Sequence, residues 1–175
     1  MPLIFITGVS TAGKSTTAKE LVNRGYEAYD AERHGMSAWY DKKTGKQAAG
    51  FNAIPQRTKE WYEQHEWRLS IDRVKELAKK AMDKPIFLCG TFSNNKEIIA
   101  LCSIVVWLKT NEKTIRERVT KPRDHDWGNV PYELALTLAN NKTSEAEYRK
   151  AGAIIIDATK PTDVVVDNIL KAVRP

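Results

Sequence analysis

The sequence predicts an α/β protein in which helices cover both faces of one parallel β-sheet. Short, almost continuously apolar runs alternate with helical patterns along the whole chain. A glycine-containing loop follows the first of these runs and precedes the first helical pattern. The length of 175 residues and the hydrophobic content of 42% are those of one compact domain, expected to span residues 1–175.

The first half of the chain is expected to begin with a strand, a loop and a helix. Residues 3–7 are apolar, with β-branched and aromatic side chains, as in a buried strand. The helix after the loop should end near Gly25, because glycine often terminates helices. Residues 26–30 predict a short second strand. Residues 31–55 have no clean period and are expected to be mostly irregular, whereas helical spacing over residues 55–82 predicts one long helix.

The second half continues the alternation of strands and helices. Its elements are expected at residues 86–89 (strand), 96–102 (short helix), 104–108 (strand), 111–120 (helix) and 153–157 (strand). After a charged loop, Pro131 should open a further helix, because proline is tolerated at the first helical position. The last helix should begin at about residue 161.

Residues 8–15 fit the phosphate-binding P-loop pattern G-x-x-x-x-G-K-[ST]. Its glycines allow a tight turn in which backbone N–H groups point at phosphate oxygens. Lys14 should reach the β- and γ-phosphates of a nucleoside triphosphate, and the Ser15 hydroxyl should bind Mg²⁺. The helix N-terminus adds its own attraction for anions. The residues expected to bind ATP here are Gly8, Ser10, Thr11, Ala12, Gly13, Lys14, Ser15 and Thr16.

The whole chain resembles a small P-loop kinase of the nucleoside-monophosphate-kinase and shikimate-kinase superfamily, within a little-characterised subgroup. The resemblance is carried by residues 8–15, by Asp30 at the end of the second strand, by Arg118 and Arg123, and by residues 156–161 before the last helix. It implies a three-layer fold with a five-stranded parallel sheet in the order 2-3-1-4-5. The phosphoryl acceptor does not follow from the resemblance.

The resemblance also implies where the substrates bind. An acceptor-binding insertion is expected at about residues 31–60, and a lid that closes over the phosphates at about residues 116–131. Thr159 and Pro161 are expected beside the adenine, in a loop that leaves the carboxyl end of the sheet. Arg118 and Arg123 match the family's lid arginines, which stabilise the negative charge that develops during phosphoryl transfer. The alternative for these arginines is a solvated basic surface.

Two carboxylates follow the second strand. Asp30 should face the γ-phosphate, where it could hold Mg²⁺ or accept the proton of an attacking hydroxyl. Glu32 resembles the second member of an acidic pair found in related kinases, although both could be solvated surface carboxylates. Residues 89–91 (Cys-Gly-Thr) offer no acidic residue at the end of the third strand. Gly90 either lets a substrate approach the backbone or simply forms a turn.

The predicted long helix has two stripes. One apolar stripe should face the core, and a second stripe mixes arginine, tryptophan and histidine. The second stripe is either an acceptor-binding surface or an exposed amphipathic face. Trp39 and Tyr40 could stack on a base or anchor the insertion. The core stripe is Trp67, Ile71, Val74, Ala78 and Ala81, and the mixed stripe is Arg57, Trp61, His65, Arg68 and Asp72. The residues expected to bind the acceptor are Asp30, Glu32, Arg57, Trp61, Arg68 and Gly90.

These features predict an ATP-dependent kinase that phosphorylates a small acceptor, with a nucleoside or nucleotide as the first choice. Lys14, Asp30, Arg118 and Arg123 would be catalytic, and Ser15 with Asp30 would hold Mg²⁺. The net charge of +6 leaves open a kinase acting on a nucleic-acid end. A non-catalytic nucleotide-binding module is the third alternative.

The remaining composition predicts a cytoplasmic protein without membrane contact. Cys89 and Cys102 lie in apolar stretches and should be buried thiols rather than a disulfide. No leader-like segment precedes the first strand, and no apolar run approaches about 18 residues. The protein is expected to be a monomer or a homodimer.

Overall fold

The computed structural model describes residues 2–50, 53–54, 57–121 and 127–173. Its main sheet is parallel and has the predicted order 2-3-1-4-5. In spatial order its strands are β2 (Glu27–Asp30), β6 (Ile86–Cys89), β1 (Leu3–Thr7), β7 (Ile104–Lys109) and β8 (Ile154–Asp157). The α/β fold expected from the sequence is therefore confirmed.

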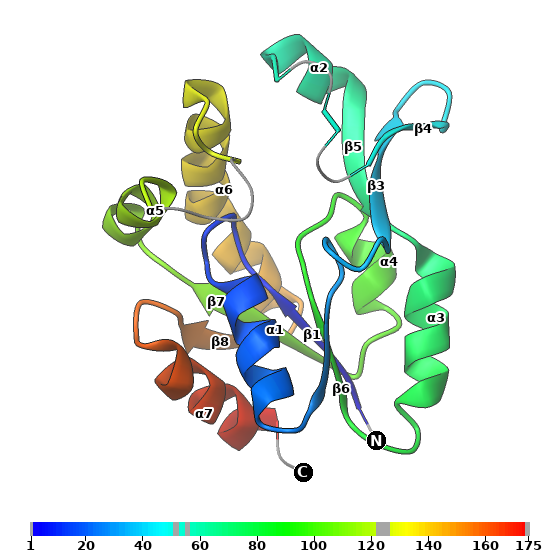
Figure 1. Cartoon of the computed structure of the whole chain (residues 1–175), viewed down its shortest axis with the longest axis vertical. Coiled ribbons are helices and arrows are strands. Elements are labelled where there is room, and N and C mark those ends of the chain that lie inside the picture. Colours follow the sequence, from blue (N-terminus) through cyan, green and yellow to red (C-terminus); the bar gives the residue numbers. More distant parts are fainter. Residues whose placement is uncertain (1, 51–52, 55–56, 122–126, 174–175) are drawn as a thin grey trace.

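Helices cover both faces of this sheet, as predicted (Figure 1). On one face, α1 (Lys14–Asn23) and α7 (Thr162–Val173) contact each other and pack on the strands. The other face is covered by α3 (Ile71–Lys80), α4 (Asn95–Ile99) and α6 (Pro131–Lys150), and α5 (Glu112–Val119) contacts α6. All five residues of β1 are buried because the strand is covered on both sides.

A second, antiparallel sheet stands above the carboxyl end of β6 (Figure 1). It consists of β4 (Gln47–Ala49), β3 (Ser37–Asp41) and β5 (His65–Leu69), and α2 (Lys59–Gln64) precedes β5 directly. The expectation of a mostly irregular segment at residues 31–55 is wrong where β3 and β4 form. The expectation of one long helix at residues 55–82 is also wrong, because β5 separates α2 from α3.

The break in the predicted helix has a clear physical cause. β5 pairs with β3 along its whole length, with Trp39 opposite Trp67, so cross-strand pairing overrides the helical pattern. Ser70 then starts a new helix, because its side chain accepts a hydrogen bond from the Arg73 backbone N–H. The mixed stripe predicted from the sequence consequently does not exist as one face. The core stripe survives on α3, where Ile71, Val74, Ala78 and Ala81 pack in or against the core.

The buried side chains form two clusters. The larger cluster surrounds the parallel sheet, and the smaller one lies in the insertion and is centred on Trp39, Trp61 and Tyr62. Cys89 and Cys102 are free thiols, buried and half-buried respectively, as the sequence predicted. The protein thus has a rigid parallel core and a smaller aromatic module beside its carboxyl edge.

Candidate functional site

The P-loop connects β1 to α1 and turns tightly over its own lysine. Gly13 has a φ of 99° and Thr11 a φ of 65°, so two residues of the loop adopt the left-handed conformation. The Lys14 Nζ atom donates hydrogen bonds to the carbonyls of Gly8 and Val9, at 3.1 and 3.0 Å. The lysine is therefore held inside the loop by backbone acceptors, at the point where the sequence predicts triphosphate binding.

The P-loop opens into a cleft of about 1650 Å³ at the carboxyl edge of the parallel sheet. The small antiparallel sheet and α6 also contribute to its walls. Most of the predicted site residues line it: Gly8, Ser10, Thr11, Gly13, Lys14, Ser15, Thr16, Asp30, Glu32, Arg57 and Arg118. Six others do not: Ala12, Trp61, Arg68, Gly90, Thr159 and Pro161.

The two predicted carboxylates lie close to Lys14. Asp30 is the last residue of β2 and only 7% exposed. Its Oδ2 atom lies 3.1 Å from Arg33 Nε as an ion pair, yet it accepts no hydrogen bond from the residues that the structure describes. Glu32 Oε1 accepts a hydrogen bond from the Thr91 backbone N–H at 3.3 Å. Burial raises the pKa of Glu32, nearby Asp30 adds to this effect, and Lys14 opposes it.

The loop after β6 contributes a residue that sequence reasoning missed. The Thr91 hydroxyl donates to the carbonyl of Gly8 and lies 3.1 Å from the Thr7 hydroxyl. Its position directly beyond the carboxyl end of a central strand was the available signal. A Cβ atom on Gly90 would lie 2.3 Å from Phe92 Cζ. Gly90 therefore makes room for Phe92, which lines the cleft where Gly90 does not, and the contact between Gly90 and a substrate stays a prediction.

Arg118 joins the two loops expected to hold the nucleotide. Its Nη1 atom donates to the carbonyl of Thr11 at 3.0 Å, and its Nη2 atom donates to the carbonyl of Ala158 at 2.7 Å. Burial lowers the pKa of this half-buried guanidinium. Arg116 does not line the cleft and pairs with Glu112 on the exposed surface of α5. The other predicted lid arginine, at position 123, lies outside the described residues.

The loop after β8 is organised by its own hydrogen bonds. Both the backbone N–H and the hydroxyl of Thr159 donate to Asp157 Oδ1, at 2.9 and 2.6 Å. Thr162, the first residue of α7, lines the cleft, whereas Thr159 and Pro161 do not. An adenine-binding role for this loop stays a prediction.

A fully buried carboxylate connects the insertion to α6. Glu133 accepts hydrogen bonds from Arg57 Nε at 2.7 Å, from Arg57 Nη2 at 2.5 Å and from the Gly128 backbone N–H at 2.7 Å. It also accepts one from the Tyr62 hydroxyl. Burial acts to raise the pKa of Glu133, but these hydrogen bonds outweigh it and hold the pKa below its usual value.

Aromatic side chains form one wall of the cleft. Trp39, Tyr62, Trp67 and Trp127 all line it. The ring centroids of Trp39 lie 5.4 Å from those of Trp67 and 6.1 Å from those of Trp127, and Tyr62 lies 5.1 Å from Trp127. Trp61 belongs to the same buried aromatic cluster but does not line the cleft, and its contact with the acceptor stays a prediction.

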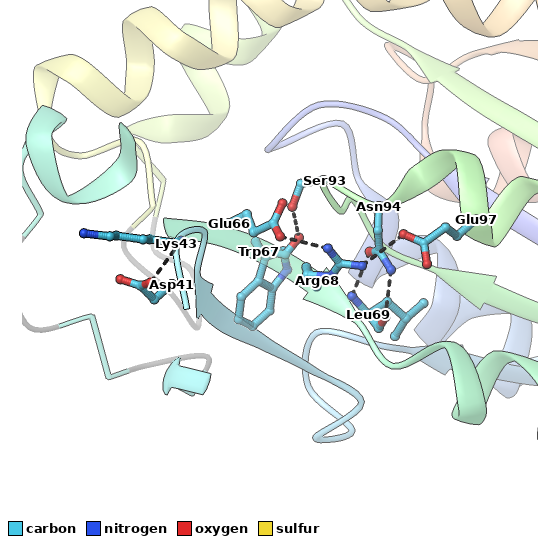
Figure 2. A network of polar contacts seen from close by, with 9 residues as sticks. All are labelled: Asp41, Lys43, Glu66, Trp67, Arg68, Leu69, Ser93, Asn94 and Glu97. Atoms are coloured by element: carbon cyan, nitrogen blue, oxygen red, sulfur yellow. Dashed lines mark hydrogen bonds and ion pairs between the residues drawn. The ribbon is translucent and has the colours of Figure 1, made fainter. Parts of the chain in front are cut away.

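Hydrogen bonds connect the C-terminal end of β5 to the loop after β6 (Figure 2). Asn94 donates to the carbonyl and accepts from the N–H of Leu69, at 3.0 and 3.1 Å. Arg68 donates to Glu66 at 2.8 Å and to Glu97 at 3.0 Å, as Figure 2 shows. These carboxylates occupy its guanidinium and Arg68 does not line the cleft, so its acceptor contact stays a prediction that this arrangement does not support.

Comparisons with known proteins agree with this geometry. Residues 4–145 match a family model described as an AAA domain. A shikimate kinase from Acinetobacter baumannii in complex with shikimate is similar in structure, with a TM-score of 0.61, 18% identity and coverage of 99% of this chain and 93% of that chain. Among curated protein sequences, none matches significantly.

Two further solved structures have the same fold. A deoxyadenosine kinase from M. mycoides with bound dATP has a TM-score of 0.55 at 15% identity, covering 97% of this chain and 98% of that chain. A gluconokinase from Sinorhizobium meliloti 1021 has a TM-score of 0.52 at 15% identity, covering 98% and 97%. The predicted resemblance to small P-loop kinases is thereby confirmed for the fold. In the described part of the chain, no helix is both long and apolar enough to span a membrane.

Proposed function

The chain belongs to the AAA domain family, and on that premise we propose that it is an ATP-dependent kinase. It would transfer the γ-phosphoryl group to a small acceptor, with a nucleoside or nucleotide as the first candidate. The observation that carries the proposal is one cleft lined by the P-loop, by two carboxylates and by an aromatic wall. Phosphate-binding, proton-accepting and ring-binding groups therefore face the same space.

The P-loop is the proposed site for the triphosphate. Lys14 would exchange its two backbone acceptors for phosphate oxygens, and the backbone N–H groups of residues 10–16 would bind the remaining charge. Arg118 would keep the P-loop at a fixed position relative to Ala158, through the hydrogen bonds that it already makes. Positioning of this kind is the main contribution that a protein makes to phosphoryl transfer.

The residues present suit a bound Mg²⁺ ion. Asp30 has a buried Oδ2 atom that accepts no hydrogen bond from the described residues, and Ser15 lines the same cleft. Carboxylate and hydroxyl oxygens are ligands that Mg²⁺ prefers. Ser15 and Asp30 are thus proposed to hold the ion, which would neutralise charge on the phosphates when bound.

Glu32 is proposed to accept the proton of the attacking hydroxyl. Its raised pKa makes it a stronger base than an ordinary solvated carboxylate. The N–H of Thr91 orients one of its oxygens. Asp30 would then bind Mg²⁺ and Glu32 would accept the proton. The sequence alone had offered both roles to Asp30.

Acceptor binding and lid closure complete the proposal. The insertion at about residues 31–60 is proposed to hold the acceptor, supported by the cleft-lining side chains Trp39 and Arg57. The segment from about residue 116 to residue 131 is proposed as the lid, with Arg118 and Arg123 as its arginines. Shikimate, deoxyadenosine and gluconate kinases share this fold, which fits a small hydroxylated acceptor.

The proposal is tested by acceptor-dependent turnover of labelled ATP. The purified protein should transfer label to at least one member of a panel of nucleosides, nucleotides, sugars and hydroxy acids. Glu32→Gln should lower that transfer by about 100-fold or more while leaving ATP affinity unchanged. Glu76→Gln, on the exposed surface of α3 and outside the cleft, is the matched control and should behave as wild type. Absence of transfer to every acceptor, with ATP bound, would contradict the proposal.

A further inference from the structure

We infer that the acceptor is an uncharged molecule with a flat aromatic ring, as a nucleoside is, and not a nucleotide or another anion. This inference rests on the proposed kinase function and names the substrate class of the same cleft. It follows from the pairing of the basic side chains, from the acidic groups beside them and from the aromatic wall.

The first step concerns Arg57, the guanidinium that the sequence offered as an acceptor ligand. It faces the cleft but makes a two-point ion pair with Glu133, whose side chain is 0% exposed. An acceptor phosphate that took Arg57 would leave the Glu133 carboxylate buried without its cation. Breaking a buried pair in this way is strongly unfavourable, so Arg57 is not available to an anion.

The other basic groups that the described insertion presents to the cleft also have partners. Arg33 lies 3.1 Å from Asp30 Oδ2. Lys42 donates to the carbonyl of Glu63 at 2.7 Å, and His65 Nδ1 lies 2.7 Å from the carbonyl of Trp61. Arg33 is thus neutralised by a carboxylate, whereas backbone carbonyls orient Lys42, His65 and also His34, whose Nδ1 atom lies 2.7 Å from the carbonyl of Asp30. Lys14 is a different case, because it belongs to the P-loop and serves ATP.

The second step is the charge that remains in the cleft. Asp30, Glu32 and Glu66 line it together with the insertion. Asp30 is paired with Arg33 and Glu66 with Arg68, whereas Glu32 accepts its hydrogen bond from the neutral backbone N–H of Thr91. An anionic acceptor brought near Glu32 would therefore be repelled by this carboxylate. A neutral acceptor that brings a hydroxyl near Glu32 meets no such cost and supplies the hydrogen-bond donor that a carboxylate accepts.

The third step is the shape of the binding surface. Trp67 and Trp127 are half-buried and line the cleft beside the more deeply buried Trp39. Aromatic faces of this kind stack on flat rings. On the side of α6, Asn140 lines the same cleft and offers its amide group to the polar edge of a base. Ring stacking and neutral polar contacts are the recognition elements of a nucleoside.

The test compares nucleosides with their own 5′-monophosphates. Quenching of tryptophan fluorescence should be measured for adenosine, guanosine, cytidine, uridine and thymidine and for the five monophosphates. A saturating non-hydrolysable ATP analogue should be present, so that neither series enters the P-loop. At least one nucleoside should bind about tenfold or more tightly than its monophosphate. Equal or tighter binding of the monophosphates, or no binding of any nucleoside, would overturn the inference.

Glu133→Gln should shift the binding preference from the nucleoside towards its monophosphate. It removes the charge that pairs with Arg57, so the advantage of the nucleoside over its monophosphate should shrink by about tenfold. Glu97→Gln is the matched control, because it releases Arg68 from one partner outside the cleft, and the preference should not change. An unchanged preference in folded Glu133→Gln protein would overturn the inference, and the wild-type ranking decides if that variant does not fold.

The outcomes separate this inference from the proposed function. A nucleoside that binds preferentially but is never phosphorylated would support the inference and contradict the kinase proposal. Efficient transfer to a nucleotide or a carboxylate-bearing acceptor would support the kinase and overturn the inference.

Discussion

Replacing Glu133 measures how firmly the insertion is attached to α6. The fully buried carboxylate accepts two hydrogen bonds from Arg57, one from Tyr62 and one from the Gly128 backbone. Removing one partner of a buried ion pair costs about 3–5 kcal/mol, and the individual hydrogen bonds do not add beyond that. Glu133→Gln keeps an acceptor oxygen and should cost about 3 kcal/mol, whereas Glu133→Ala also leaves a cavity and should reach the upper end of the range.

Urea unfolding at pH 7 gives the free energies of unfolding directly. A domain of this size loses about 2–4 °C in Tm for each kcal/mol, so Glu133→Gln should melt roughly 6–12 °C below wild type. Glu97→Gln removes one partner of an ion pair with Arg68 whose carboxylate side is 52% exposed. That change should cost less than about 1 kcal/mol, because solvent already screens the pair.

The difference in unfolding free energy between wild type and Glu133→Gln should also depend on pH, which provides a second check. Because the pKa of Glu133 is lowered in the folded protein, its stabilisation is fully present above the ordinary glutamate value of about 4.3. It is lost as the pH falls through the lowered folded value, so the gap between wild type and Glu133→Gln should narrow in acid. A gap below about 1 kcal/mol at pH 7, or one that widens in acid, would refute the reasoning.

Three further predictions concern the cleft. Lys14→Ala should lower phosphoryl transfer by about 100-fold or more, while its circular dichroism spectrum stays that of the folded wild type. The control Lys113→Ala, on the exposed face of α5, should keep the wild-type rate. Normal turnover by Lys14→Ala would exclude the P-loop role. The raised pKa of Glu32 predicts that the wild-type rate of transfer falls on acidification at a pH above the ordinary glutamate pKa, and a rate that stays flat down to about pH 4 would contradict this. The same shift predicts that Glu32→Gln is more stable than wild type at pH 7. This difference in unfolding free energy should vanish in acid, where the wild-type carboxyl is protonated. Gly90→Ala should cost about 1–3 kcal/mol of unfolding free energy because of the contact with Phe92, and Phe92→Leu in the same chain should restore part of it; a neutral Gly90→Ala would contradict the packing role.

The parallel sheet and the P-loop were predictable because their signals are local. Residues 3–7 are apolar at every position, which is what a strand covered on both faces requires. The loop pattern follows that strand within the next eight residues and fixes the position of Lys14. Asp30 and Glu32 were predictable from the same rule, since the carboxyl ends of parallel strands meet at one edge.

The antiparallel sheet was not predictable in the same way, because its pairing connects distant residues. Residues 65–69 form a strand as they pair with residues 37–41, and no local period reports that partnership. One local signal was present: Ser70 is a good helix N-cap and marks a new helix start. Reading residues 55–82 as a single helix placed Trp61 and Arg68 on one shared face, which the structure divides between α2 and β5.

Glu133 shows most clearly why the acceptor side required a structure. From the sequence, a glutamate at the third position of a helix is an ordinary first-turn acid that stabilises the helix N-terminus. In the fold, this side chain faces inward and receives Arg57 from 76 residues earlier in the chain. It also binds Gly128, within the segment predicted as the lid, and Tyr62, in the wall of the cleft. One buried carboxylate thus connects the lid segment, the acceptor module and α6. We therefore expect acceptor binding and lid closure to be coupled, since the same side chain positions the lid segment and the acceptor module.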